Sequence, residues 1–210
     1  NGVKRSDDGG LTWTDVLGFQ QGGFSNPGSD FVEIIVTSTG VFYATLSTDG
    51  PSKGIFRSDD GGLNWTSITP TTFPTSWGRL TMAINPEDEN IIWFFGAAST
   101  GEANNHGLFR YEYLSGDGSG TGGSWIDRSA NLPDQSCYIN AINAEIGTLS
   151  TQSSFDLHVA IHPVDTSVIY IAGTSIWRNK DAFTHDSTNK WIGGYLCDPL
   201  PYDDLNWRSE

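Results

Sequence analysis

Two carboxylates and one histidine have the side-chain types that acid–base chemistry needs. Asp156 stands two residues before His158, and Glu102 lies in a long polar stretch between apolar runs. Cleavage of a glycosidic bond uses two carboxyl groups about 5–10 Å apart across a cleft. Asp156 and Glu102 are therefore the candidate catalytic residues, although Asp156 and His158 would equally form a structural hydrogen bond. Further carboxylates that the sequence alone cannot pair are Asp30, Asp49, Asp134 and Glu145.

Aromatic and polar side chains in the same polar stretches have the chemistry of a ligand site. Trp and Tyr rings stack on sugars or anchor peptides, and charged groups supply polar contacts. The alternative for each ring is that it only covers the packing of the strands beneath it. The candidate ligand-binding residues are Trp77, Arg79, Tyr138, Asp156 and His158, with His106, Phe155 and Tyr195 on the same stretches. The sequence contains no nucleophile elbow, phosphate-binding loop or zinc-binding spacing.

The elements that position these residues can be recognised from a sequence repeat. RSDDGGLTW at residues 5–13 returns as RSDDGGLNW at residues 57–65 with a single difference, and repetition at a fixed period is typical of repeat architectures. Weaker versions follow at Arg110 and Arg178, each with an acidic turn and then a Trp. Before Arg57, Arg110 and Arg178 the chain reads as strand, turn, strand; a third strand ends at each arginine, and a fourth begins at the Trp that follows the acidic turn. One period therefore predicts four short strands, the blade of a β-propeller; the alternative is two separate β-sandwiches.

Both strong copies match the pattern S-x-D-x-G-x-x-W. Its members are Ser6, Asp8, Gly10, Trp13, Ser58, Asp60, Gly62 and Trp65. In this pattern the chain resembles the Asp-box (BNR) β-propeller families, which include sialidases, sortilin-like receptors and xyloglucan-cleaving endoglucanases. A short carboxylate accepts backbone N–H groups in a tight turn, Gly allows positive φ, and Trp buries a large ring. The resemblance implies that these residues are structural, in turns on the rim away from the ligand-binding face.

The repeat predicts an all-β chain that forms one β-propeller segment over residues 1–210, with about three to four blades. Its parts are a partial blade over 1–30, blades over 31–78, 79–130 and 155–195, and the start of another unit over 196–210. The long connections gather on one face, where we expect a ligand to bind. Because an open arc of blades exposes strand edges, we expect further propeller blades or a partner chain to cover it.

Charge and cysteine content indicate the partners and the compartment. Eleven basic residues face 25 acidic ones, a formal net charge of −14, so nucleic acid is not an expected partner. No run reaches the roughly 18 apolar residues of a membrane span. The acidic, lysine-poor composition predicts an extracellular or cell-surface protein, in which Cys137 and Cys197 either form a disulfide between neighbouring blades or remain buried thiols. The run at 115–123 is either a calcium-binding loop or a solvated one, and no other metal or cofactor is expected.

Recognition of a glycan or protein ligand is the function that these features predict. The same resemblance offers two alternatives: a polysaccharide-cleaving glycoside hydrolase similar to the xyloglucan-cleaving enzymes, and a sortilin-like peptide-binding receptor. The sialidase reaction needs a cluster of three arginines and a Tyr nucleophile, and only Arg79 is suitably placed for it.

Overall fold

The computed structural model describes residues 2–18, 29–50, 52–98, 106–133, 138–139, 145–146, 149–152 and 154–194. These residues form short antiparallel strands, with two single-turn 3-10 helices, η1 (Gly120–Gly122) and η2 (Ser129–Asn131). The prediction of an all-β chain is therefore confirmed. Within the described ranges, none of the helices has the length and apolar composition needed to cross a bilayer.

Three four-stranded antiparallel sheets make up most of the structure, each with its strands in chain order. The first contains β3 (Val32–Val36), β4 (Phe42–Leu46), β5 (Gly54–Ser58) and β6 (Thr66–Ser67). The second contains β7 (Trp77–Ile84), β8 (Ile91–Ala98), β9 (His106–Tyr113) and β10 (Gly123–Asp127). The third contains β13 (His158–Ile161), β14 (Ile169–Ala172), β15 (Ser175–Asn179) and β16 (Lys190–Gly194).

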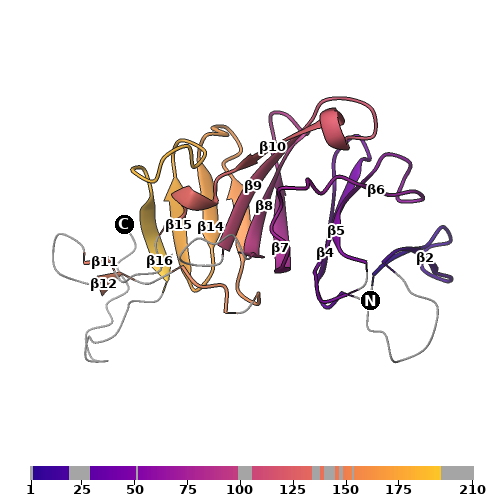
Figure 1. Ribbon diagram of the computed structural model, residues 1–210, viewed down its shortest axis with the longest axis horizontal. Helices are drawn as coiled ribbons and strands as arrows, with labels where there is room; N and C mark the ends of the chain where they lie inside the picture. Colours follow the sequence, from indigo (N-terminus) through magenta and orange to yellow (C-terminus); the bar gives the residue numbers. More distant parts are fainter. Residues whose placement is uncertain are drawn as a thin grey trace.

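Two shorter pairs of strands accompany these sheets: β1 (Val3–Arg5) with β2 (Thr14–Leu17), and β11 (Tyr138–Ile139) with β12 (Glu145–Ile146). Figure 1 shows the three larger sheets standing side by side, with the β1–β2 pair beyond the β3–β6 sheet. The first strands of the three sheets are neighbours, since β7 contacts both β3 and β13. This is a propeller-like arrangement, in which each sheet takes the place of a blade.

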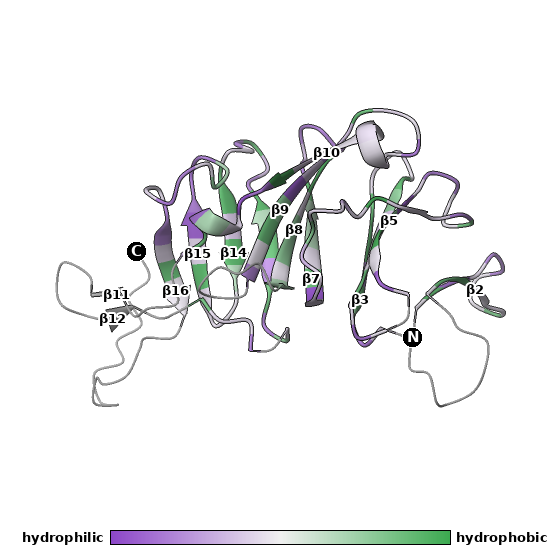
Figure 2. Ribbon diagram, viewed as in Figure 1, coloured by the Kyte–Doolittle hydropathy of each residue, from purple (hydrophilic) through white to green (hydrophobic). Residues whose placement is uncertain are grey.

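Aromatic side chains fill the space between neighbouring sheets. In β8, Phe94 belongs to a buried cluster that includes Tyr43 of the β3–β6 sheet, whereas Phe95 belongs to a second cluster that includes Ile171 of the β13–β16 sheet. Successive side chains of a strand point to opposite faces, so the β7–β10 sheet is covered on both. That coverage explains why β8 reads IIWFFGAA, without a charged side chain. Figure 2 shows green, hydrophobic stretches in the strands of the sheets and purple, hydrophilic stretches in several of the turns.

The two matching turns, Ser6–Trp13 and Ser58–Trp65, have the same hydrogen bonds. In the second, the Gly62 N–H donates to Ser58 Oγ (3.0 Å), the Asn64 N–H donates to Asp60 Oδ1 (2.9 Å), and Trp65 Nε1 donates to the Gly62 carbonyl (3.1 Å). Gly61 and Gly62 both have positive φ, which glycine adopts without strain. In each turn, the side chains of one serine and one aspartate accept most of the backbone N–H groups. The turn therefore satisfies its hydrogen bonds without help from the rest of the protein.

The single difference between the two copies preserves this chemistry. Thr12 Oγ1 donates to Asp8 Oδ2 (2.6 Å), and Asn64 Nδ2 donates to Asp60 Oδ2 (2.7 Å). Hydrogen bonds from Thr12 lower the pKa of Asp8 to about 2, and those from the backbone and side chain of Asn64 lower the pKa of Asp60 to about 2. A carboxylate that accepts several N–H groups favours its charged form.

We expect Asp60→Ala to lower the melting temperature by several degrees at neutral pH, because three N–H groups of the turn lose their acceptor. Because the pKa of Asp60 in the folded state lies below the ordinary aspartate value of 3.8, its charge stabilises the fold above pH 3.8, and this contribution disappears as the pH falls towards about 2. The difference between wild type and variant should shrink over the same interval. Circular dichroism melts across pH measure it, with the exposed Asp186→Ala as control; equal melting temperatures for the two variants would contradict the structural role.

Candidate functional site

The sheets have two different ends. At one, the turn end, short turns join the strands within each sheet, at residues 37–41, 59–65, 85–90 and 162–168. At the other, the loop end, the connections include residues 29–31, 47–50, 74–76 and 149–152. Figure 1 places the turn end beside η1 at the top of the view and the loop end below the sheets. The candidate ligand-binding residues that the structure describes in full lie at the loop end.

Arg79 forms an ion pair with Glu33 across two neighbouring sheets. Its Nη2 lies 3.0 Å and its Nε 3.2 Å from Glu33 Oε2. Arg79 sits in a bulge of β7, where the pairing register with β8 shifts between Trp77 and Leu80; such bulges re-aim a side chain. Gly96 makes room for this bulge, because a Cβ there would lie 2.1 Å from the Arg79 carbonyl oxygen.

A pair of aspartates lies beside the start of β3. The Asp30 N–H donates to Asp49 Oδ2 (2.9 Å), which holds the two residues side by side. A side-chain hydrogen bond with Asp49 and the Asp49 charge raise the pKa of Asp30. Burial acts to raise the pKa of Asp49, but hydrogen bonds from Ser47 and Asp30 outweigh it and lower that pKa. The environment therefore favours the charged form of Asp49 more than that of Asp30.

The segment before β13 reaches across the β7–β10 sheet. The Phe155 and Asp156 N–H groups donate to the Thr151 carbonyl at 2.9 and 3.1 Å. Ser154 lies against Gly78, where a Cβ would meet its Oγ at 2.2 Å. This approach brings the Phe155 ring to 6.2 Å from the Phe31 ring, edge to face. Phe155 remains 70% exposed, an unusual state for a large apolar ring.

The predicted ligand-binding residues have different fates. The expectation that Trp77 is an exposed stacking platform is wrong: it is 7% exposed, and its Nε1 donates to the Leu46 carbonyl (3.1 Å). Trp77 is drawn inwards because β7 begins there, earlier than the sequence pattern indicated. Asp156 and His158 are exposed at the loop end. Tyr138 lies in β11, and its side chain is outside the described part of the chain.

Of the other residues singled out in the sequence, the structure describes some and not others. His106 is buried, and its Nε2 lies 3.1 Å from Thr151 Oγ1, so it supports the 149–152 segment. Glu102, Cys137 and Cys197 lie outside the described residues, and their predicted roles remain predictions. In the run at 115–123, Asp117 Oδ1 accepts the N–H and hydroxyl of Ser119. Among the residues described, no group of three or more His, Cys, Asp or Glu is placed to hold a metal ion.

Phe31 and the pairing of Glu33 with Arg79 were not predicted. The sequence did contain a signal for the Glu33–Arg79 pair, since Glu33 is the only charge in the otherwise apolar run FVEIIV. A charge in such a run needs a partner. No comparable signal marks Phe31, because its neighbour Phe155 lies far away in the sequence and the contact depends on the chain crossing at Gly78.

We expect Gly96→Ala to cost about 1–3 kcal/mol of unfolding free energy, because the added methyl group must displace the bulge that carries Arg79. Gly193→Ala is the matched control: Gly193 also lies in a strand, and a Cβ there meets nothing within 4 Å. Denaturant unfolding of both variants measures the difference. Equal stability of the two variants would show that the bulge does not constrain position 96.

Comparison with known proteins places the fold. No protein-family model matches the sequence, and no curated protein matches it. Among solved structures, the GH74 enzyme of Niastella koreensis aligns with 93% of the chain at a TM-score of 0.50 and 19% identity, and the chain spans 26% of that structure. An α-L-arabinofuranosidase from Fusarium graminearum, solved with an iminosugar inhibitor, aligns with 90% of this chain and 71% of its own at a TM-score of 0.33 and 13% identity. The chain therefore shares the fold of about one quarter of the GH74 enzyme.

Proposed function

We propose that the chain is a segment of an Asp-box β-propeller whose loop end binds a glycan. Two observations support the fold part of this proposal: the hydrogen bonds of the two matching turns, and the similarity to the GH74 enzyme. The turns close on themselves at the opposite end from Arg79 and Phe155. Their residues, Asp8 and Asp60 above all, act in folding and leave the loop end for recognition.

The exposed ring of Phe155 against Phe31 is the observation that carries the binding proposal. A sugar ring has apolar C–H faces and a rim of hydroxyl groups, and it binds where an aromatic surface adjoins a few placed polar groups. Arg79 and Glu33 supply such groups in a fixed geometry. Exposed Asp156 and His158 lie next to Phe155 in the sequence and add further donors and acceptors.

Polysaccharide hydrolysis is the second candidate, favoured by the similarity to the GH74 enzyme. The Asp30–Asp49 pair does not suit it, because the hydrogen bond from the Asp30 N–H to Asp49 Oδ2 holds the two residues next to each other, whereas a glycosidase needs its carboxyl groups on the two sides of the scissile bond. Asp49 is also held by Ser47 and Asp30. Asp156 and Glu102 therefore remain the carboxylates to test for turnover.

Three further parts of the proposal concern the chain's surroundings. Trp13 is 59% exposed, Ile34 and Val36 of β3 are also exposed, and β1 and β2 form a sheet of only two strands. Further propeller blades or a partner chain would cover such a surface. The acidic charge supports an extracellular or cell-surface location, and a Cys137–Cys197 disulfide would suit that compartment.

We expect Phe155→Ala to weaken binding of an oligosaccharide on the order of tenfold or more, because it removes a central aromatic contact. Its melting temperature should stay close to that of the wild type, since the ring is largely exposed. Isothermal titration calorimetry with soluble oligosaccharides of xyloglucan, cellulose and xylan measures the affinity. Val164→Ala, which removes an exposed apolar side chain at the turn end, is the control. Binding that is equal in both variants, or confined to peptides, would contradict the proposal.

Incubation of the protein with xyloglucan, cellulose and xylan distinguishes binding from cleavage. We expect no new reducing ends from the wild-type chain. Steady release of oligosaccharides that is abolished in Asp156→Asn or Glu102→Gln, with binding retained, would instead establish hydrolysis.

A further inference from the structure

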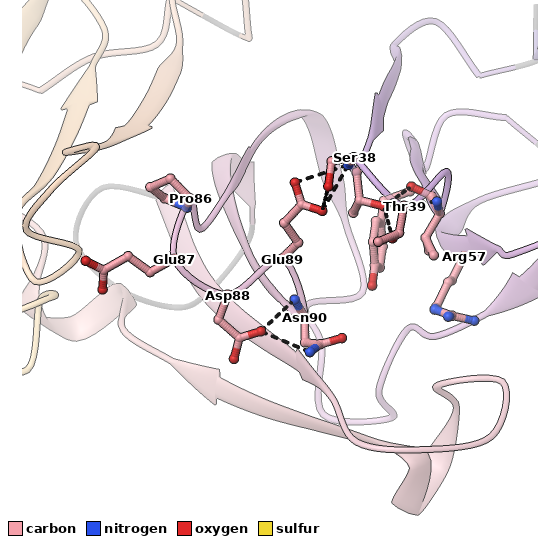
Figure 3. Close-up of a pocket in the computed structure, with 11 residues that line it drawn as sticks. Ser38, Thr39, Arg57, Pro86, Glu87, Asp88, Glu89 and Asn90 are labelled. Atoms are coloured by element: carbon pink, nitrogen blue, oxygen red, sulfur yellow. Dashed lines mark hydrogen bonds between the residues drawn. The ribbon is translucent and has the colours of Figure 1, made fainter.

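A groove opens at the turn end, on the opposite side of the sheets from Phe155. It lies between the β3–β4 turn and the β7–β8 turn and has a volume of about 420 Å³. One wall comes from residues 37–41, the other from residues 86–90, and the side chains of Tyr43 and Arg57 also line it. Figure 3 shows the two turns facing each other across it. A volume of this size lies in the range of small-molecule sites.

Both walls are held in place by the protein itself. The Ser38 N–H and Oγ donate to the Glu89 carboxylate, which ties one turn to the other (Figure 3). Asn85 Oδ1 accepts the Glu87 N–H, and Asp88 Oδ1 accepts the N–H and Nδ2 of Asn90. The groove is therefore shaped before any ligand arrives, which reduces the ordering that binding would require.

Arg57 gives the groove a cation with an unused donor. Its side chain is 7% exposed, lies 4.3 Å above the Tyr113 ring, and pairs with Asp59 through Nη1 at 3.0 Å. Its Nε is buried and has no hydrogen-bond partner within the protein. A buried donor without an acceptor is costly, so an oxygen atom that enters beside Arg57 would stabilise it.

The chemistry of the walls decides which ligand can supply that oxygen. Asp88 and Glu89 give the wall opposite residues 37–41 a negative charge, which repels an anion despite Arg57, whereas the Glu87 carboxylate points away and accepts from Thr166 Oγ1. An ammonium group would satisfy the carboxylates but offers no acceptor to Arg57. A hydroxyl group both donates to a carboxylate and accepts from a guanidinium, so a polyhydroxylated neutral molecule satisfies both.

We propose that this groove is a second site, for a neutral saccharide of one or two rings. It is separate from the glycan site proposed at the loop end and shares no residue with it. A chain with both sites would contact a polysaccharide on two faces. A substitution at one site would then weaken binding there and leave binding at the other site unchanged.

Nuclear magnetic resonance of the full chain tests the site directly. The arginine Nε–H resonances are recorded during titration with xylose, glucose and cellobiose, and with glucuronate and spermidine as charged probes. We expect the Arg57 resonance to shift with the neutral sugars and to respond little to the charged probes. We also expect Asp88→Asn to weaken the neutral-sugar interaction by about tenfold, because it removes a charged acceptor. Phe155→Ala should leave it unchanged.

The chain contains a matched control for Asp88. Asp165 occupies the same place in the β13–β14 turn, where His162 Nδ1 accepts its N–H and its Oδ1 accepts the Ser167 N–H; Asp165→Asn should bind the sugars as the wild type does. Thr39→Trp, at an exposed position of the β3–β4 turn, should abolish binding by filling the groove with the indole ring. No shift at Arg57 with millimolar neutral sugars, a preference for glucuronate or spermidine, or equal binding by Asp88→Asn and Asp165→Asn would each overturn the proposal.

Discussion

Face-to-face packing of neighbouring sheets is the constraint on which the rest of the structure depends. A sheet of short strands that is apolar on both faces is stable only when another sheet covers each of them. Trp125 of β10 illustrates the contact: its ring centre lies 4.9 Å from that of Tyr111 and 5.7 Å from that of Phe73, while its Nε1 donates to the Ile68 carbonyl at 3.0 Å. One side chain thus joins the β7–β10 sheet to the chain that follows β6.

Where two sheets pack face to face, their ends remain accessible for recognition. The ends differ physically. At the turn end, Asp60 and Asn85 close their turns with hydrogen bonds inside each sheet. At the loop end, the principal contacts join different sheets: Arg79 pairs with Glu33, and Thr48 Oγ1 donates to the Trp77 carbonyl at 2.9 Å. The two sites proposed for ligands, one at the loop end and one in the groove between two turns, both lie where two sheets meet.

Features formed by residues close together in the sequence, such as the turns, could be predicted from the sequence. The matching strings at residues 5–13 and 57–65 predicted two equal turns, and their one difference, Thr12 against Asn64, proved to be two donors to the same carboxylate position. Contacts between sheets could not be predicted, because the partners lie far apart in the sequence and depend on how the sheets stack. For this reason Trp77 was expected at the surface but lies inside, the Asp30–Asp49 pair could not be chosen among the carboxylates, and the groove lined by Arg57 and Glu89 left no trace in the sequence.

Hydrogen exchange with and without a xyloglucan oligosaccharide tests the central claim, that the loop end is a glycan-binding surface, most directly. Amides of the loop end exchange with solvent unless a ligand covers them or orders their hydrogen bonds. The account predicts slower exchange at residues 30–33, 77–79 and 154–158 when the oligosaccharide is bound. Binding that leaves exchange in all three segments unchanged would contradict it.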